Sequence, residues 1–329
     1  MNRFQRRASA PFLKVNSGEI EHPLRYIGSI TPHQYTEDPT VAWEMLKVKR
    51  PVKLVRQMRL DSPIKNDHVR FVCIACLHGS LLNPMTIPPG DVLVIAGDIT
   101  NYGFPDEIKA FNENMAKLRY PFKVAIAGNH DCTFDEAYLK SSGKDIGEKE
   151  LALKKKLVAA LAQSKITNPK SLLTEVIYLQ DSLIEIFGIR IYGTPWQPRY
   201  DNLAFNISRG QQILDKWNQI PAGIDVLITH TPPLGHGDML PSGIRVGCVE
   251  LLNSCVRRIR PKYHIFGHVH QGYGCTSDGY TKFVNCSYQN ANGTKNSPII
   301  FDMPIGADMK SQFMNNYLKL MKKRSSPKV

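Results

Sequence analysis

Long apolar runs are missing from this sequence. A helix that crosses a bilayer needs about 20 consecutive, mostly apolar residues, and no stretch of the 329-residue chain provides them. Residues 1–7 (MNRFQRR) also lack the apolar stretch of a secretory signal peptide. We therefore expect a protein without a membrane span that works in the cytoplasm, with the nucleus as the alternative location.

A regular cysteine framework is missing as well. The seven cysteines are an odd number and are scattered without a repeating spacing, whereas small secreted proteins carry paired cysteines in a disulfide framework. Reduced thiols in the cytoplasm or nucleus are the better interpretation. Internal repeats and linker-like stretches are also absent, which favours a single folded domain.

Acidic residues are scarce relative to basic ones. Asp and Glu number 29 against 42 Lys and Arg, which gives a formal net charge of +13. This excess favours anionic partners: phosphorylated substrates, nucleic acid or acidic membrane surfaces. A soluble protein with basic ends explains it equally well, because both termini are basic. Residues 318–324 (LKLMKKR) fit a solvated tail that continues a helix better than a membrane anchor.

The sequence divides into three segments. Residues 1–68 carry proline and charge with little periodicity, which predicts an extended basic N-terminal segment with one short helix near 41–48. Residues 69–305 form the predicted folded domain, and 306–329 form a basic C-terminal tail. A hydrophobic content of 42% is enough for a large core.

Apolar strands alternate with helical patterns from residue 69 onward. Runs at 69–75, 91–96 and 122–127 predict buried strands, and the spacing of 105–118 predicts a helix between the last two. This order indicates parallel β-α-β units covered on both faces. Further helices are predicted at 148–163, 208–217 and 249–258. Further strands are predicted at 176–179, 184–186, 189–192, 226–228, 263–266, 282–285 and 298–301. The first three of these strands are expected to form an antiparallel meander.

Polar motifs directly follow the predicted strands. They are CLH (76–78), GD (97–98), GNHD (128–131), TH (229–230) and GHVH (267–270). Because the carboxyl ends of parallel strands meet at one edge of a sheet, we expect these motifs to gather there. Several strand ends that deliver His, Asp and Asn to one rim are typical of a metal site.

Each motif alone has an ordinary structural explanation. A Gly-Asp pair after a strand is most often a turn or a helix N-cap, and Gly-Asn-His is most often a turn. His268 and His270 share one face of an extended backbone, but exposed histidines are common without a metal. The occurrence of all the motifs together, each after a strand, favours a metal site.

In this order the motifs resemble those of the calcineurin-like metallophosphoesterase superfamily, whose pattern runs Asp-x-His, Gly-Asp, Gly-Asn-His-Asp/Glu, His and Gly-His-x-His. The resemblance covers residues 69–303. The stretches YGTPWQP (192–198), THTPPLGHGD (229–238) and RVGCVELLN (245–253) are similar to the animal metallophosphoesterase-domain-containing proteins, a subgroup known from brain and linked to hydrolysis of cyclic-nucleotide phosphodiesters. The resemblance implies an α/β fold, a four-layer α/β/β/α sandwich.

The resemblance also implies a role for each motif residue. Asp98 would bridge two divalent transition metals (Mn, Fe, Zn or Co), and His130 would face the phosphate, where it stabilises charge or protonates the leaving oxygen. Asp131 would orient His130. The remaining ligands would be His78 and His270 for the first metal and Asn129, His230 and His268 for the second.

Cys76 stands where the family pattern has its first aspartate, and three interpretations of it are open. It ligates as a thiolate and favours Zn or Fe, or it is an inert small residue beside a weakly filled first metal site. In the third interpretation the site is dead and the domain is a binding module. Asp67 lies before the strand instead of after it, so it does not replace the missing carboxylate.

Two functions therefore stay open. The first is a metal-dependent phosphodiesterase that acts on a small phosphodiester such as a cyclic nucleotide, with nuclease and protein phosphatase activity as variants that share the metal centre. The second is a non-catalytic interaction or scaffold protein with a degenerate site. Trp196 or Tyr273 stacks a nucleobase or simply packs, and Arg245 grips a phosphate or lies in a solvated loop.

Overall fold

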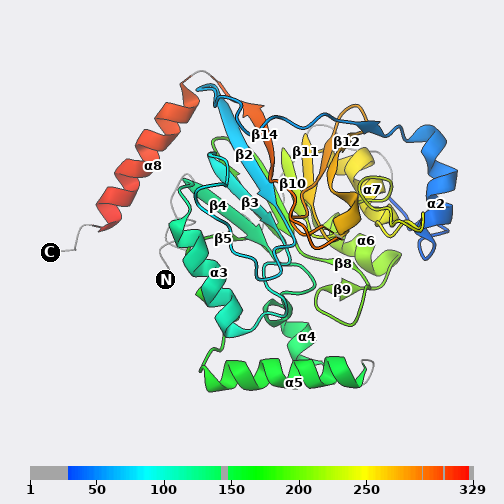
Figure 1. The fold of residues 1–329 in the computed structure, drawn as a ribbon. Coiled ribbons are helices and arrows are strands. Elements are labelled where there is room, and N and C mark those ends of the chain that lie inside the picture. Colours follow the sequence, from blue (N-terminus) through cyan, green and yellow to red (C-terminus); the bar gives the residue numbers. More distant parts are fainter. Residues whose placement is uncertain (1–28, 142–146, 291, 307, 326–329) are drawn as a thin grey trace.

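The computed structural model describes residues 29–141, 147–290, 292–306 and 308–325, with side chains as far as residue 319. Two β-sheets pack against each other, and helices lie on their outer faces (Figure 1). Residues 1–28 of the predicted basic N-terminal segment lie outside the described residues, as do residues 326–329 of the predicted tail.

The five-stranded sheet is parallel except at one edge. β2, β3, β4 and β5 run parallel, and β14 pairs antiparallel with β2. The central strands are runs of Val, Ile, Phe and Ala buried on both faces, as parallel strands covered by helices must be. In spatial order the strands are β14 (Ile299–Pro304), β2 (His68–Ile74), β3 (Val92–Ala96), β4 (Phe122–Ile126) and β5 (Ile177–Tyr178).

The seven-stranded sheet has a parallel centre and antiparallel edges. β7, β10, β11 and β13 run parallel, whereas β6 pairs antiparallel with β7, and β12 pairs antiparallel with β13 and β1. In spatial order the strands are β1 (Lys53–Leu54), β12 (Gly274–Ser277), β13 (Lys282–Asn285), β11 (Tyr263–Phe266), β10 (Val226–Thr229), β7 (Ile189–Thr194) and β6 (Ser182–Ile186). A small separate pair consists of β8 (Gln197–Pro198) and β9 (Asn206–Ile207).

The core between the two sheets is built by alternate residues of each strand. On β2, Phe71 and Cys73 join the core between the sheets, whereas Val72 and Ile74 join the core on the helix side. Phe71 also stacks on Phe301 of the neighbouring β14, with ring centroids 5.0 Å apart. Loss of such a fully buried ring costs about 3–5 kcal/mol.

Helices complete the outer layers. On the five-stranded sheet, α3 (Pro105–Lys117) packs Ile108, Phe111 and Met115. The seven-stranded sheet is covered by α6 (Gln211–Asn218) and α7 (Val249–Ser254), and α7 runs on into a π-helical turn at Cys255–Ile259. Two further helices are α4 (Glu136–Lys140) and α5 (Glu148–Gln163). The predicted four-layer α/β/β/α architecture is confirmed.

The predicted meander of strands 176–179, 184–186 and 189–192 is wrong in its first member. β6 and β7 do form an antiparallel hairpin, but β5 pairs in parallel with β4 in the other sheet. Leu179 and Asp181, which has a left-handed backbone with φ of 49°, carry the chain from one sheet to the other. Short β-prone runs close together in sequence are not always neighbours in a sheet, since the chain here changes layer between them.

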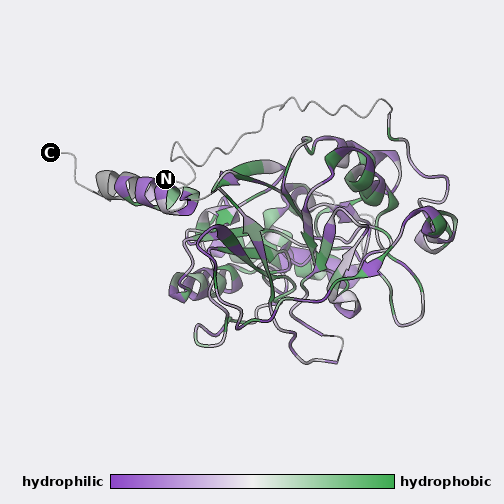
Figure 2. Ribbon diagram, turned by 90° about the horizontal axis from the view of Figure 1, so that it is seen from above, coloured by the Kyte–Doolittle hydropathy of each residue, from purple (hydrophilic) through white to green (hydrophobic). Residues whose placement is uncertain are grey.

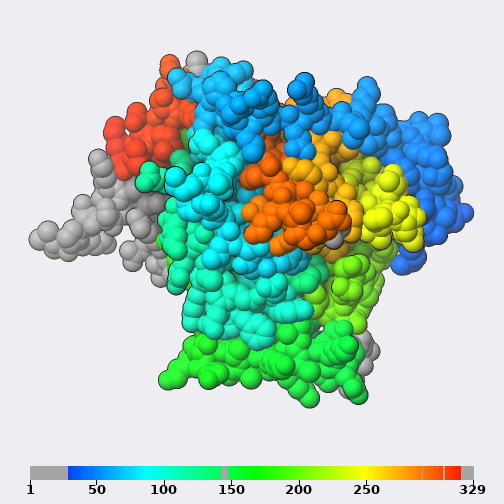
Figure 3. All heavy atoms as spheres, in the orientation of Figure 1, coloured from blue at the N-terminus to red at the C-terminus, as the bar shows by residue number. Residues whose placement is uncertain are grey.

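The described ends of the chain lie on the outside of the sandwich. α2 (Pro39–Leu46), close to the predicted helix at 41–48, packs Trp43 with Leu234, Val249 and Leu252. In Figure 3 this blue segment covers the yellow region around α7. At the other end α8 (Met309–Ser325) extends away from the sandwich (Figure 2), and the rings of Phe313 and Tyr317 pack against Phe122. Among the described residues, no helix combines the length and the apolar character that crossing a membrane requires.

Candidate metal centre

The predicted site residues come from the carboxyl ends of strands in both sheets. β2 leads into Cys76 and His78, and β3 leads into Asp98. The end of β4 supplies residues 128–131, whereas β10 and β11 of the other sheet supply His230 and residues 267–270. Because the two sheets are stacked with these strand ends on one side, five loops converge on one place.

The loop backbone turns sharply so that these side chains point back over the strand ends. Cys76, His78, Asp98 and His268 all have positive φ, between 45° and 67°, which is unusual for residues with a Cβ. Each such conformation costs on the order of 1 kcal/mol or more and is common at functional sites. Backbone hydrogen bonds hold the turns, including Cys76 N–H to the Gly97 carbonyl at 2.9 Å.

One group of ligand atoms surrounds Asn129. His230 Nε2 lies 3.1 Å from Asn129 Oδ1 and 3.1 Å from Asp98 Oδ2, and His268 Nδ1 lies 3.1 Å from Asn129 Oδ1. Asp98, His230 and His268 offer ligand atoms that lie within 4.8 Å of one another. These are the residues that the family resemblance assigns to the second metal.

A second group lies on the other side of Asp98. Cys76, His78 and His270 offer ligand atoms within 4.8 Å of one another, and the Nε2 atoms of His78 and His270 are 3.2 Å apart. Asp98 Oδ2 lies 3.6 Å from His78 Nε2, so the same carboxylate faces both groups. The predicted bridging position of Asp98 matches this geometry.

The two groups fit cations because they bring acceptor atoms together. His230 Nδ1 lies 3.0 Å from the Ala96 carbonyl oxygen, so the ring donates its Nδ1 proton there and presents an unprotonated Nε2 when neutral. This Nε2 then faces the Asp98 carboxylate and the Asn129 amide oxygen. Three acceptor atoms aimed at one another repel unless a cation or a proton lies between them. A ligand set of mixed nitrogen and oxygen atoms suits Mn, Fe, Zn or Co.

The pKa values of two histidines and of Asp98 also favour binding of a cation. Burial lowers the pKa of His268 to about 3 and that of His78 to about 4, which keeps both rings in the neutral form that ligates metals. Burial would raise the pKa of Asp98, but the imidazoles of His230, His130 and His78 outweigh it and hold this pKa well below its usual range. Asp98 is therefore an anion beside the neutral rings of His78 and His268, whereas its carboxylate outweighs burial and raises the pKa of His230.

His130 is partly exposed, and its ligand atom lies within 4.8 Å of those of His78 and Asp98, although it does not belong to the group around Asn129. Its Nδ1 is 2.8 Å from the Asn101 carbonyl oxygen, which fixes the ring and places the proton on Nδ1 when the ring is neutral. Its own backbone N–H donates to Asp98 Oδ1 at 2.9 Å. The ring lies edge-on to His78, with centroids 4.5 Å apart.

Asp131 does not orient the His130 ring, contrary to the role inferred from the sequence. Its carboxylate accepts hydrogen bonds from the backbone N–H groups of Gly128, Ile99 and Thr100 and from the Thr100 hydroxyl, at 2.7–3.1 Å. The carbonyl of Asn101 takes the place next to the imidazole. Asp131 therefore ties the loop after β4 to the loop after β3, and it acts on the centre by holding these two loops together.

Glycines are required where the loops approach each other. A Cβ at Gly97 would lie 2.4 Å from His230 Nδ1, and a Cβ at Gly128 would lie 2.2 Å from Asp98 Oδ1. Both distances are far shorter than real Cβ contacts allow. These two glycines let Asp98 and His230 come within reach of each other.

The residues proposed for specificity take mainly structural positions. Trp196 donates its Nε1–H to Asp181 at 2.8 Å and lies under the Lys216 ammonium, and Arg245 pairs with the buried Asp238 at 2.5 Å. Tyr200, which the sequence did not single out, has a half-exposed ring 4.9 Å from the His268 ring. Its position in the loop between β8 and β9, just after the YGTPWQP stretch, was the available signal.

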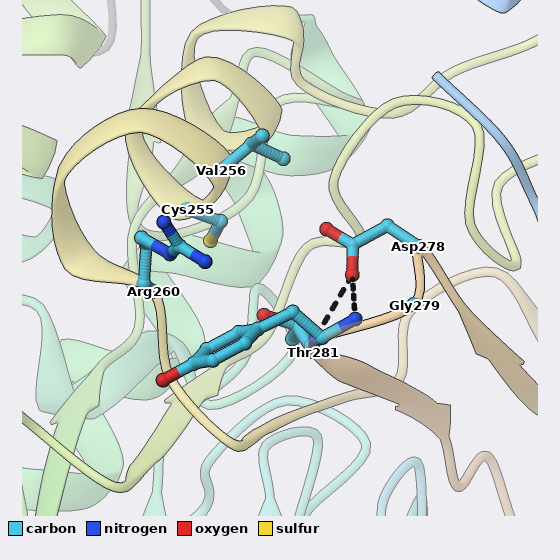
Figure 4. Close-up of a pocket in the computed structure, with 7 residues that line it drawn as sticks. Cys255, Val256, Arg260, Asp278, Gly279 and Thr281 are labelled. Atoms are coloured by element: carbon cyan, nitrogen blue, oxygen red, sulfur yellow. Dashed lines mark hydrogen bonds between the residues drawn. The ribbon is translucent and has the colours of Figure 1, made fainter.

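A separate depression of about 410 Å³ lies near Cys255, Arg260 and Tyr280 (Figure 4). Asp278 there accepts hydrogen bonds from the backbone N–H groups of Tyr280 and Thr281, and this pattern is typical of a turn that starts with aspartate. The depression borders the starts of β11 and β13, at the opposite edge of the sheet from the metal-facing residues. None of the predicted site residues lines it.

The chain is similar to known proteins. The family profile described as calcineurin-like phosphoesterase matches residues 69–272. A Caenorhabditis elegans protein named UPF0046 protein T07D4.2 is 59% identical over 297 residues, which cover 89% of this chain and 75% of the relative. Metallophosphoesterase domain-containing protein 1 of Homo sapiens is 43% identical over 279 residues, which cover 82% of this chain and 84% of the relative.

Proposed function

The chain belongs to the calcineurin-like phosphoesterase family, and from this premise we propose that it is a metal-dependent phosphoric ester hydrolase that acts on small phosphodiesters, with cyclic nucleotides as the favoured class. The observation that carries the proposal is the convergence of Asn129, His230 and Asp98 acceptor atoms at 3.1 Å, next to a second group that shares Asp98.

Two divalent transition metals are proposed as cofactors. His78 and His270 would hold one, Asn129, His230 and His268 the other, and Asp98 would face both. When bound, such a pair of cations polarises phosphoryl oxygens and lowers the pKa of a water molecule toward neutrality. The chain contributes the placement: positive-φ turns and the two glycines keep the donors aimed at one place before any substrate arrives.

His130 is proposed as the residue that meets the substrate. Its Nδ1–H is committed to the Asn101 carbonyl, so Nε2 is the atom available to the phosphate or the leaving oxygen. In the protonated ring, Nε2–H would stabilise charge on the phosphate and give its proton to the departing alkoxide. Asp131 positions this residue indirectly, because its hydrogen bonds to Thr100 and Gly128 hold the loops that carry Asn101 and His130.

A small diester is favoured for two reasons. The chain carries an excess of basic residues, and the half-exposed Tyr200 ring beside His268 offers a face for a nucleobase. The motif stretches at 192–198 and 229–238 resemble a subgroup linked to cyclic-nucleotide hydrolysis.

All seven cysteines are free thiols in the described structure, which supports a cytoplasmic location.

The test combines metal content with hydrolysis. The purified full chain should hold close to two equivalents of transition metal by elemental analysis and hydrolyse an aryl phosphodiester and a cyclic nucleotide. His130→Ala should lower kcat by about 10²–10⁴-fold, the usual contribution of a general acid, while the bound metal stays. His33→Ala, a histidine on the N-terminal segment far along the chain from the motifs, is the matched control and should leave both quantities unchanged.

The non-catalytic alternative makes the opposite prediction. A scaffold that only reuses the fold has no need of the imidazole at position 130. Hydrolysis at the level of the uncatalysed reaction in a protein that binds its metals, with no difference between the wild type and His130→Ala, would refute the enzyme proposal and support the scaffold.

A further inference from the structure

Cys76 is fully buried and lies inside the first group of metal-facing atoms. Its Sγ is within 4.8 Å of the ligand atoms of His78 and His270, and its backbone φ of 54° turns the side chain toward them. A cysteine and two histidines from three separate loop positions are a ligand set in their own right. Such a set differs from the carboxylate and two histidines that the family pattern has there.

Burial and the nearby Asp98 carboxylate raise the pKa of the Cys76 thiol, so a bound cation has to displace its proton, and the hydrogen bonds to the sulfur assist this step. The backbone N–H of His268 donates to Cys76 Sγ at 3.0 Å, and the Ser287 hydroxyl lies 3.6 Å from it. Hydrogen bonds from N–H groups to sulfur stabilise the anionic form and orient its lone pairs, as partners of metal ligands generally do. The same contact ties Cys76 of the first group to the backbone of His268, a residue of the second.

Other buried cysteines near the centre are arranged differently. Cys132 and Cys286 each direct their sulfur at a backbone carbonyl oxygen, Asn129 at 3.5 Å and Phe266 at 3.3 Å respectively. A sulfur facing a carbonyl must keep its proton and donate it, so these two stay thiols. Cys76 accepts a hydrogen bond from the His268 N–H and, among the hydrogen bonds of the described residues, has no carbonyl oxygen as a partner, so no backbone acceptor holds its proton.

We infer that Cys76 is a metal ligand and that it makes the first position of the proposed centre selective for zinc over manganese. The inference rests on the proposed metal-dependent function. On binding, the S–H bond breaks, the proton leaves to solvent and a sulfur–metal bond forms. A thiolate with two imidazoles favours zinc, whereas the position built from Asp98, Asn129, His230 and His268 has only N and O donors and accepts harder ions.

Cobalt substitution tests the sulfur ligand directly. Metal-free full-length protein titrated with Co²⁺ should develop a sulfur-to-cobalt charge-transfer band in the near ultraviolet. Cys76→Ser should abolish this band while cobalt still binds at the second position. Cys275→Ser should keep the band; Cys275 is the matched control because it is the one cysteine of the seven that is partly exposed and open to adventitious metal.

A measurement on the wild-type protein tests the sulfur ligand even if the Cys76→Ser variant fails to fold. X-ray absorption of the zinc-loaded wild type should show a sulfur scatterer at about 2.3 Å in addition to nitrogen and oxygen at about 2.0–2.1 Å. Cys76→Asp should then weaken zinc binding relative to manganese by at least tenfold, within the roughly 10–100-fold range that changes around metal ligands produce.

The possible results separate this inference from the proposed function. Stoichiometric metal with no sulfur scatterer, or a cobalt band that survives Cys76→Ser, overturns the role of Cys76 and leaves the phosphoesterase proposal standing. Failure of the wild type to bind any of these metals overturns both. A sulfur–metal bond without hydrolysis supports the ligand role and refutes the enzymatic function.

Discussion

At the scale of single residues, the candidate centre depends on backbone conformations that most side chains avoid. Cys76, Asp98 and His268 each have positive φ, and each pays on the order of 1–3 kcal/mol for it. The hydrogen bonds around Asp131 offset part of this cost, because its carboxylate accepts several bonds from two different loops. The centre is therefore held in place before a metal binds.

Gly128 is the residue whose replacement should separate metal binding from folding. In Gly128→Ala the new Cβ would lie 2.2 Å from Asp98 Oδ1 and 2.7 Å from the His230 ring, so the Asp98 carboxylate must move. We expect metal affinity to fall by about 10–100-fold or more, measured by competition with a chelator. Gly147→Ala is the matched control, because its new Cβ would meet only the flexible end of the half-buried Glu150 side chain. Equal metal affinity in the two variants would contradict the prediction.

The motif residues could be predicted from the sequence, but their partners could not. The spacing of Gly97-Asp98 and of residues 267–270 after apolar runs was enough to predict a shared rim. The hydrogen bond between the Asn101 carbonyl and the His130 ring cannot be predicted from the sequence, since every residue has a backbone carbonyl. The resemblance assigned Asp131 to the His130 ring, whereas the carboxylate accepts its side-chain hydrogen bond from Thr100 across the loop, a contact that the motif pattern does not contain.

At the scale of elements, prediction succeeded where strands are long and apolar. β2, β3 and β4 follow the expected runs closely because both of their faces are buried. Failure came with short strands: β5 has only two residues, and β12 (Gly274–Ser277) is half-exposed with little apolar pattern. The pairing of such strands is set by the layers around them, which no local window of sequence contains.

A buried ion pair joins two elements that are far apart in the chain. Arg70 of β2 is only 1% exposed and meets Asp302 of β14 through two nitrogen–oxygen contacts at 2.8 and 2.9 Å. Asp302→Ala should destabilise the fold by about 3–5 kcal/mol in urea unfolding, because it leaves a buried guanidinium without its counter-ion. Glu44→Ala, which removes the exposed partner of Lys47, should cost about 0–1 kcal/mol.

The reason for the cost can be tested with a double variant. If desolvation of the lone guanidinium causes the loss, Arg70→Met combined with Asp302→Leu should recover most of the stability, because the pair is replaced by apolar side chains of similar size. A double variant as unstable as Asp302→Ala would show that the contacts of Arg70 with the Ser62 and Pro63 carbonyls matter more.

At the scale of the whole molecule, two buried histidines outside the metal centre link stability to pH. His236 stacks on Phe283 with ring centroids 3.7 Å apart, and His264 lies beside Thr229 in the same sheet. Burial, together with the charge of Arg245, lowers the pKa of His236 to about 3, and burial with the neighbouring His236 lowers that of His264 to about 3. Both rings are neutral in the folded protein at neutral pH.

The folded protein should therefore lose stability as the solution becomes acidic. A histidine in the unfolded chain takes up a proton near pH 6.5, whereas these two resist it until about pH 3. Their contribution is complete above pH 6.5 and declines as the pH falls toward 3, by up to about 1.4 kcal/mol per pH unit for each ring.

His236→Gln keeps a polar partner for Thr276 but cannot titrate. Between about pH 6 and pH 4 its unfolding free energy should fall less steeply than that of the wild type, by about 1.4 kcal/mol per pH unit. The substitution leaves the candidate metal centre unchanged, so any release of metal in acid would affect both proteins alike and cancel in the comparison. Parallel curves would show that the His236 ring is protonated in the folded state, which its stacking on Phe283 and the nearby guanidinium of Arg245 make unfavourable.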